Sequence, residues 1–248
     1  MERYEAKRAV IIGGTSGMGL ATAKMLLDGG ARVLVTGRSQ AGLESAEKEL
    51  GTGAIVVSSD ARSLTDIDAL ASRVKTEFDT FDLLFVNAGF ATFAPFENTT
   101  EAIYDEMFNL NAKGPFFAVQ KLAPLINRGG SVVLTTSIAN VKGMPGIATY
   151  GAAKAALRSF ARVLAAELLP WGIRVNAVTP GPIDTPILDK AFPDKDAAAH
   201  VKEQMIGMNP MKRFGTSEEI AKAVLFLAFD ATFTTGAELP VDGGASQL

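Results

Sequence analysis

The chain alternates short apolar runs with segments of helical length, and this alternation restricts the possible folds more than any other feature. The apolar runs are nearly continuous, which is typical of strands in a parallel sheet that helices cover on both faces. Two intervening segments, Leu64 to Phe78 and Ser217 to Ala228, have the apolar period of an α-helix. We therefore predict an α/β fold in which residues 1–248 form a single domain around a doubly wound parallel sheet. The expected strands are Ala9 to Ile12, Arg32 to Thr36, Ala54 to Ser58, Leu83 to Val86, Ser131 to Thr135, Arg174 to Val178 and Glu238 to Val241.

A glycine-rich turn lies between the first strand and the helical stretch from Leu20 to Leu27. It contains Gly13, Gly17 and Gly19. Glycines let the backbone approach a pyrophosphate closely, and a helix N-terminus presents unpaired N–H groups to it. The spacing is neither G-x-G-x-x-G nor that of a P-loop. The turn predicts a nucleotide phosphate site, with an ordinary structural turn as the alternative.

Tyr150 and Lys154 are one helical turn apart, and Ser137 follows the apolar run that ends at Thr136. Residues four positions apart lie on the same helix face. A phenol with a pKa of about 10 is a poor proton shuttle at neutral pH, and a cation about 4 Å away at an effective dielectric near 20 supplies about 4 kcal/mol, enough to lower that pKa by about 3 units. We therefore expect an acid–base centre in which Lys154 lowers the pKa of Tyr150. A solvated helix face is the alternative for an isolated Tyr–Lys pair.

With these motifs the chain resembles the short-chain dehydrogenase/reductase family over nearly its whole length. The resemblance implies a Rossmann-like fold, and Ile12 departs from it because a threonine is usual there. Further matches are Asp60, Asn87-Ala88-Gly89, Pro180-Gly181 and Val241-Asp242-Gly243-Gly244. The catalytic residues that the resemblance implies are Asn111, Ser137, Tyr150 and Lys154. The cofactor-binding residues that it implies are Gly13, Thr15, Ser16, Gly17, Met18, Gly19, Arg38, Ser39, Asp60, Ala61, Asn87, Ala88, Gly89, Tyr150, Lys154, Pro180, Gly181, Ile183 and Thr185.

The resemblance also implies a reaction, hydride transfer at a nicotinamide with Tyr150 as the proton partner. In the reducing direction Tyr150 would protonate the alkoxide, and Ser137 would hydrogen-bond the same oxygen. Lys154 would also hold the nicotinamide ribose, and Asn111 would hold a water that links the lysine to solvent. The choice of Asn111 over Asn109 depends on family spacing alone.

The end of the second strand bears on the choice of cofactor. A carboxylate there would bind the ribose 2′-hydroxyl of NAD and repel the 2′-phosphate of NADP. The chain instead has Gly37 followed by Arg38, whose guanidinium suits a phosphate. We therefore predict NADP(H) rather than NAD, and the alternative is that Arg38 is merely solvated.

Composition argues against several other classes of function. The formal net charge is −3, which gives no basic surface for nucleic acid or anionic lipid. Cysteine is absent, and the single histidine, His200, is expected to be solvated, so we predict no metal site. No apolar run is long enough to cross a membrane, and we expect a cytoplasmic protein.

The substrate is the part of the function that the sequence specifies least. Residues 182–210, interrupted by four prolines, resemble by position the family's substrate lid, with an ordinary surface excursion as the alternative. The residues expected to line the pocket are apolar and suit a bulky apolar ketone or secondary alcohol, although they could equally belong to the core. They are Phe90, Phe93, Ile138, Val141, Met144, Pro145 and Leu188.

The sequence leaves two alternative functions open and also bears on the oligomeric state. A dinucleotide-binding sensor is one alternative, but it would not need Ser137, Tyr150 and Lys154 together. Enoyl reduction is another, although relatives that catalyse it space Tyr and Lys more widely. Helices beginning near Thr100 and Ala148 carry long apolar stretches, from which we expect a homotetramer, with a homodimer as the next alternative.

Overall fold

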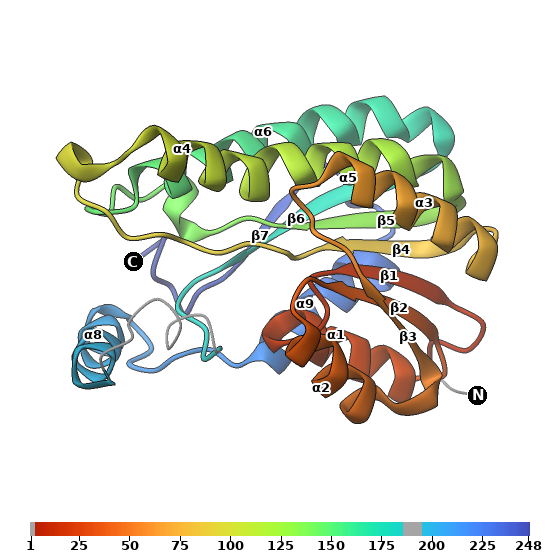
Figure 1. Cartoon of the computed structure of the whole chain (residues 1–248), viewed down its shortest axis with the longest axis horizontal. Coiled ribbons are helices and arrows are strands. Elements are labelled where there is room, and N and C mark those ends of the chain that lie inside the picture. Colours follow the sequence, from red (N-terminus) through yellow and green to blue (C-terminus); the bar gives the residue numbers. More distant parts are fainter. Residues whose placement is uncertain (1–2, 186–194) are drawn as a thin grey trace.

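A seven-stranded parallel sheet forms the centre of the molecule in the computed structural model, which describes residues 3–185 and 195–248 (Figure 1). The strand order is β3-β2-β1-β4-β5-β6-β7. All seven predicted strands and the doubly wound arrangement are confirmed. The strands are β1 Arg8–Ile12, β2 Arg32–Gly37, β3 Ala54–Ser58, β4 Phe81–Val86, β5 Ile126–Thr135, β6 Arg174–Pro180 and β7 Glu238–Val241.

Helices cover both faces of this sheet. One face carries α3 to α6 and the other carries α1, α2 and α9, while α8 stands apart beyond the carboxyl ends of the strands (Figure 1). The bounds are α1 Gly17–Asp28, α2 Gln40–Leu50, α3 Leu64–Phe78, α4 Glu101–Phe108, α5 Gly114–Leu122, α6 Ala148–Leu168, α8 Lys195–Met208 and α9 Ser217–Leu225. A π-helical turn, η3 Asn109–Lys113, joins α4 to α5, and another follows α9 at Phe226–Asp230. None of the helices in the described ranges is both long and apolar enough to cross a membrane.

Two hydrophobic cores, one on each face of the sheet, explain why the strands have continuous apolar sequences. Val10 and Ile12 pack in the core beneath α3, α5 and α6, whereas Ile11 packs in the core against α1 and α9. Leu84 and Phe85, both fully buried, likewise belong to opposite cores. Successive residues of a strand point to opposite faces, so a strand buried on both faces needs apolar residues throughout.

Strand order places the carboxyl ends of β1 and β4 at the switch point of the sheet. From β1 the chain winds outward to β2 and β3, and from β4 it winds the other way to β5, β6 and β7. The connections above neighbouring strands β1 and β4 therefore diverge, which opens the crevice where ligands bind in such sheets.

Candidate active site

A cleft of about 750 Å³ lies beyond the carboxyl ends of the central strands. The segments that follow β1, β2, β3, β4, β5 and β6 all contribute to its lining, together with α6 and α8. Of the predicted catalytic and cofactor residues, Ser137, Tyr150 and Lys154 line it at one end, and Arg38, Ser39 and Asp60 lie along it. The topology therefore gathers predicted site residues that are up to 172 positions apart in the sequence, from Gly13 to Thr185, in one cavity.

The turn after β1 is closely packed against the turn after β4. Gly13 has a φ of +80°, and a Cβ there would lie 2.7 Å from the backbone of Ala88. A Cβ on Gly19 would lie only 2.2 Å from the carbonyl oxygen of Gly13. Only glycine fits either position.

The N-terminus of α1 is free of competing groups. Its first turn contains no acidic side chain, and Ser16 makes no side-chain capping bond. The first N–H groups of α1 therefore remain available to an anion.

Two side chains brace this turn, where Ile12 supplies no hydroxyl. The amide of Gly13 donates to the carbonyl oxygen of Thr36 at 3.2 Å, and its distance to the Thr36 hydroxyl is 3.4 Å. Asn87 Nδ2 donates to the Gly13 carbonyl at 2.9 Å, and Asn87 Oδ1 in turn accepts from the Thr135 hydroxyl at 3.1 Å. Although position 12 carries no threonine, the turn is therefore held by Thr36 of β2 and by Asn87 after β4.

The segment after β2 carries an exposed arginine. A Cβ on Gly37 would lie 2.6 Å from the Thr15 side chain, which explains a glycine there, and Ser39 Oγ caps α2 by accepting from the Gly42 amide. Arg38 is exposed on the cleft and makes no hydrogen bond or ion pair with any residue that the structure describes. A planar cation without a protein partner is suited to an incoming anion.

Asp60, in contrast, has a protein partner. Its carboxylate accepts two hydrogen bonds from Arg62 Nε and one from a terminal guanidinium nitrogen at 2.6 Å. These hydrogen bonds hold the pKa of Asp60 below its ordinary value against the opposing effect of burial, and the charge of Arg38 adds to the lowering. Asp60 therefore stays ionised at the side of the cleft.

Tyr150 and Lys154 project from the first turns of α6 toward the end of β5. Lys154 is 3% exposed, and its Nζ donates to the carbonyl oxygen of Thr135 at 2.8 Å. The same nitrogen lies over the Tyr150 ring, 5.7 Å from its centroid. Ser137 Oγ accepts from the Ala139 amide at 3.2 Å and shares a hydrogen bond with Tyr150. The helix spacing and the strand end thus bring together the three groups that the sequence singled out.

The pKa directions differ from the expectation for this pair. Burial raises the pKa of Tyr150 above 10.0, and the hydrogen bond with Ser137 offsets this only in part. Burial also lowers the pKa of Lys154 to about 7. The sequence argument was wrong on the effect of the lysine because it placed a full positive charge beside the hydroxyl. In the structure the amine lies over the ring, and its own charge is penalised by burial.

Asn111 lies in the π-helical turn η3 and is fully buried. Its Nδ2 donates to the carbonyl oxygens of Phe90 and Met107 at 3.1 and 3.0 Å. Its Oδ1 is buried and has no partner among the described residues. A Cβ built on Gly89 would lie 2.8 Å from this Oδ1 and 3.2 Å from Lys154 Nζ, so both atoms border the same small space. Asn109 is partly exposed and does not border the space beside Lys154. The position of Asn111 next to Lys154 therefore favours Asn111 over Asn109, as family spacing does.

The segment after β6 closes the cleft opposite the glycine turn. Gly181 packs on Asp242, where a Cβ would lie 2.7 Å from the Asp242 Cα. Ile183 forms a parallel bridge with Gly215 that uses the carbonyl of Pro182 and the amide of Asp184. The amide and carbonyl of Ile183 therefore face the other way, as alternate residues do in a ladder. Thr185 lies beside Gly17, at 3.3 Å from an added Cβ.

The predicted substrate residues do not all meet in this cleft. Phe90 and Phe93 line it, whereas Met144 and Pro145 line a neighbouring hollow of about 410 Å³. Ile138 is buried in the short helix η5, Ile138–Asn140, and Val141, which follows it, is 66% exposed. Neither is among the residues that line the two cavities, so their role in the substrate pocket stays a prediction. Leu188 lies outside the described residues.

Sequence reasoning missed Leu110, Thr92 and Met205, all of which line the cleft. Leu110 adjoins Asn111 in the π-helical turn, which no apolar periodicity signals. Met205 comes from α8, whose placement against the sheet depends on tertiary structure.

Comparisons with known proteins agree with this geometry. Residues 13–246 match a family model described as enoyl-(acyl carrier protein) reductase, of the short-chain alcohol dehydrogenase type. An oxidoreductase of Sarocladium schorii is 37% identical over 100% of this chain and 99% of its own length. The 3-oxoacyl-(acyl-carrier-protein) reductase of Thermotoga maritima is 34% identical over 98% of each chain. The crystal structure of a levodione reductase superimposes with a TM-score of 0.90 at 32% identity, covering 98% of this chain and 99% of that one.

Proposed function

The chain belongs to the short-chain dehydrogenase/reductase family, and on that premise we propose that it is an NADP(H)-dependent oxidoreductase that interconverts a ketone and a secondary alcohol. The observation that carries the proposal is the convergence of Ser137, Tyr150 and Lys154 on a cleft that the glycine turn and Arg38 also line. A protein that only bound a dinucleotide would have no need of a half-buried phenol and a buried amine beside a serine hydroxyl.

The residues present fit a nicotinamide dinucleotide. The glycine turn is too closely packed for a side chain, and the N-terminus of α1 has no acidic residue to compete with a pyrophosphate. Lys154 and the outward-facing backbone of Ile183 would hold the nicotinamide riboside half, and Asp60 would hold the adenine. When bound, the nicotinamide would supply or accept the hydride.

The preference for NADP(H) rests on two neighbouring residues. Gly37 removes the carboxylate that would accept the ribose 2′-hydroxyl, and Arg38 offers an unpaired guanidinium at the same place. Ser39 Oγ already accepts the Gly42 amide, which leaves its hydroxyl proton free for a phosphate oxygen.

The acid–base roles follow from the shifted pKa values. Because burial raises the pKa of Tyr150, the phenol stays protonated at neutral pH and can donate its proton to the oxygen of a ketone that is being reduced. Ser137 would hydrogen-bond the same oxygen. Lys154, with a pKa of about 7, can gain or lose a proton near neutrality. The unpaired Oδ1 of Asn111 beside it would hold a water through which that proton returns from solvent.

Substrate class is inferred from the lining of the cleft beyond Tyr150. Phe90 and Phe93 supply apolar surface, and Met205 of α8 adds to it. We therefore propose a bulky apolar ketone or secondary alcohol as substrate. The predicted lid, residues 182–210, stays a proposal, and its residues 186–194 lie outside the described residues. The relatives are named for different substrates, among them a 3-oxoacyl-(acyl-carrier-protein) reductase of Thermotoga maritima and a levodione reductase of Leifsonia aquatica.

A panel of ketones and secondary alcohols, each assayed with NADPH or NADP⁺ and with NADH or NAD⁺, tests this function. The absorbance of the reduced nicotinamide follows the reaction. We expect turnover of apolar ketones, with a lower KM for NADPH than for NADH. Turnover of enoyl thioesters and not of ketones would support the enoyl reductase alternative, and cofactor binding without any turnover would support a sensor.

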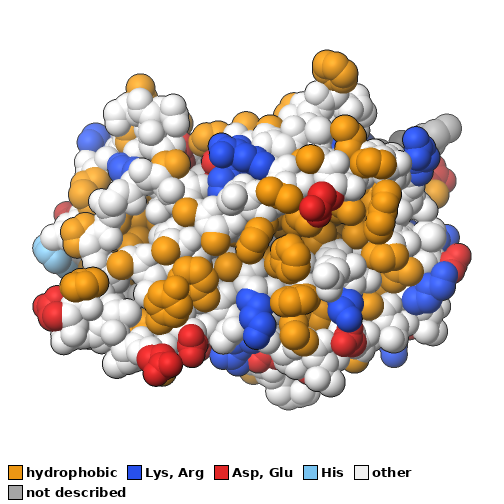
Figure 2. All heavy atoms as spheres, turned by 90° about the horizontal axis from the view of Figure 1, so that it is seen from above, with side chains coloured by type: hydrophobic (Ala, Val, Ile, Leu, Met, Phe, Trp, Pro, Cys, Tyr) orange, Lys and Arg blue, Asp and Glu red, His pale blue; other side chains and the backbone are white. Residues whose placement is uncertain are grey.

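We also propose that the protein assembles as a homotetramer. Figure 2 looks onto the face formed by α4, α5 and α6, and hydrophobic side chains gather over its middle. The exposed apolar residues of this region include Tyr104, Val163 and Trp171, each about half exposed. An apolar face of this kind favours closed symmetric association. Light scattering that gives a mass near 26.1 kDa at micromolar concentration, with full activity, would contradict the proposal.

A further inference from the structure

Glu238, the first residue of the edge strand β7, is a partly buried carboxylate with four side-chain partners. Its side chain is 17% exposed. Oε1 lies 2.8 Å from the Thr136 hydroxyl, 2.6 Å from the Thr179 hydroxyl and 2.5 Å from Asn140 Nδ2. Oε2 accepts from Arg158 Nε at 2.9 Å. Removing such a charge from water is costly, and the proposed reaction assigns the group no part in binding or proton transfer.

Two of these partners flank Ser137. Thr136 precedes it directly, and Asn140 ends the short helix η5 that follows it. Ser137 itself is fixed more weakly, because its Oγ accepts only the Ala139 amide in addition to the hydrogen bond it shares with Tyr150. Glu238 therefore bonds to side chains on both sides of the serine, in addition to the backbone hydrogen bonds from the Thr136 amide to Val178 and from the Asn140 amide to Ser137.

The fourth partner lies on the helix that carries the rest of the acid–base centre. Tyr150, Lys154 and Arg158 are spaced by four residues and project from the same face of α6. Arg158 is 13% exposed, and it also donates to the carbonyl oxygen of Gly236, just before β7. One carboxylate thus joins the turn that contains Ser137 to the face of α6 that contains Tyr150.

The carboxylate is ionised in this setting. Burial raises the pKa of Glu238, but the hydrogen bonds from Thr179, Thr136 and Asn140 and the charge of Arg158 outweigh burial, so the pKa lies below its ordinary value. A neutral amide could still accept the hydroxyl donors, but its NH₂ group would then face the Arg158 guanidinium or the Asn140 amide, which are both donors.

From this juxtaposition we propose that Glu238 is a positioning residue, which sets the Ser137 hydroxyl relative to the Tyr150 phenol by holding both supporting segments at once. The inference rests on the proposed function. It predicts that loss of the carboxylate misplaces two groups that must share one substrate oxygen. A displacement of that kind impairs the chemical step, and it leaves the glycine turn and Arg38 as they are.

The test compares Glu238→Gln with wild type for kcat and KM on the best ketone of the panel, for the Kd of NADPH from its fluorescence, and for the thermal midpoint. We expect kcat to fall about 10- to 100-fold with the Kd of NADPH unchanged within about twofold. Glu49→Gln is the matched control, because Glu49 forms an exposed ion pair with Lys24 on the far side of the molecule from α6. It should leave every value unchanged.

A second pair of variants serves if Glu238→Gln does not fold. Thr179→Val removes one donor without changing the shape of the side chain, and Thr179→Ser keeps the hydroxyl. A lower kcat in the valine variant with near wild-type kcat in the serine variant supports the inference. It is overturned if wild type is active and Tyr150→Phe is not, while Glu238→Gln or Thr179→Val keeps full kcat. It is also overturned if the Kd of NADPH rises in step with the fall in kcat. A wild type without turnover on the panel would instead refute the proposed function.

Discussion

The two ends of the cleft use charge in opposite ways. At the adenosine end Arg38 is exposed, and hydrogen bonds from Arg62 hold the pKa of Asp60 below its ordinary value. At the catalytic end burial raises the pKa of Tyr150 and brings that of Lys154 down to about 7. Hydrogen bonds from a guanidinium thus dominate the pKa at one end of the cleft, and burial dominates the pKa values at the other.

A third element, the glycine turn, serves both ends and carries no charge. Its contribution is backbone geometry, with Gly13 against Ala88 and Gly19 against the Gly13 carbonyl. The largest effect on cofactor binding should therefore come from a methyl group placed in this turn, and not from any change of charge.

Gly19→Ala is expected to weaken NADPH binding by at least about 100-fold, because the new Cβ would lie 2.2 Å from the Gly13 carbonyl oxygen and must displace the phosphate-binding backbone. Fluorescence titration measures the Kd. Gly207→Ala in α8 is the control, since a Cβ there meets no atom within 4 Å. Unchanged binding by Gly19→Ala would mean that the turn does not hold the cofactor.

Arg38→Ala should raise the KM for NADPH about 10- to 100-fold, the effect of losing a charge-assisted contact of about 1.5–3 kcal/mol, and leave the KM for NADH nearly unchanged. The two cofactors control for each other in one preparation. If both values of KM change equally, Arg38 has no part in recognising a 2′-phosphate. A wild-type preference for NADH would refute the argument from Gly37 and Arg38 altogether.

Lys154 makes the catalytic end sensitive to pH in a predictable direction. Its pKa is about 7 in the folded protein, below the ordinary value of 10.5, so unfolding takes up a proton between these values and stability rises with pH. From pH 7 to pH 9 this adds about 2 kcal/mol, or about 4–8 °C in thermal midpoint. Above pH 10 the raised pKa of Tyr150 acts the other way, because the unfolded phenol ionises first.

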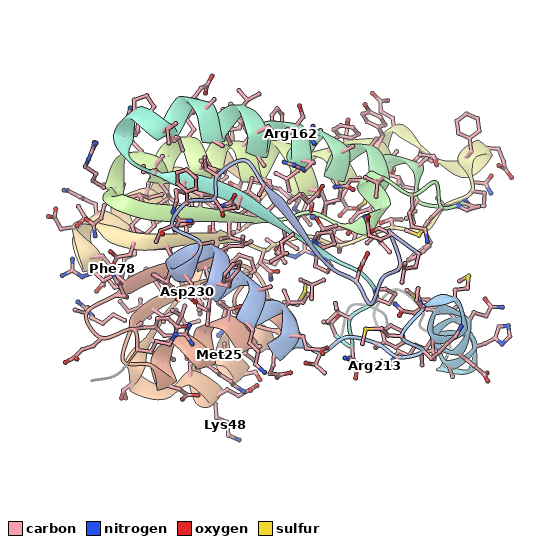
Figure 3. All side chains as sticks on the ribbon, turned by 180° about the vertical axis from the view of Figure 1, so that it is seen from behind. Met25, Lys48, Phe78, Arg162, Arg213 and Asp230 are labelled. Atoms are coloured by element: carbon pink, nitrogen blue, oxygen red, sulfur yellow. The ribbon has the colours of Figure 1, made fainter. Side chains whose placement is uncertain are left out.

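Lys154→Met should remove this gain between pH 7 and pH 9, whereas Lys48→Met should keep it. Lys48 is exposed on α2 and points away from the sheet (Figure 3). Thermal melts of both variants and of wild type across the interval make the measurement. An equal gain in wild type and Lys154→Met would show that the lysine is not deprotonated by burial.

The sequence predicted the sheet and the convergence of the site better than it predicted the energetics. Continuous apolar runs located every strand, although β5 begins at Ile126 and not at Ser131, because Asn127, Gly129 and Gly130 interrupt the pattern. Motif residues that follow strands were brought together because parallel strands share one carboxyl edge.

Burial and orientation were the parts that could not be predicted. Helical spacing placed Lys154 near Tyr150 but could not show that its Nζ turns to the Thr135 carbonyl or that burial would dominate both pKa values. The sequence predicts Glu238 only as the start of a strand, because its partners at 136, 140, 158 and 179 reach it through tertiary structure alone. Met205 of α8 likewise reaches the cleft only through tertiary structure, so the sequence does not predict it.

The most direct measurement is turnover and cofactor binding by Tyr150→Phe in a single preparation. This variant removes the phenolic hydroxyl at the catalytic end and leaves the glycine turn and Arg38 intact. If Tyr150 is the acid, the Kd of NADPH stays near that of wild type, while kcat on the best ketone falls by about two to four orders of magnitude. Retention of most of the wild-type kcat, with NADPH still bound, would contradict the assignment of Tyr150 as the acid.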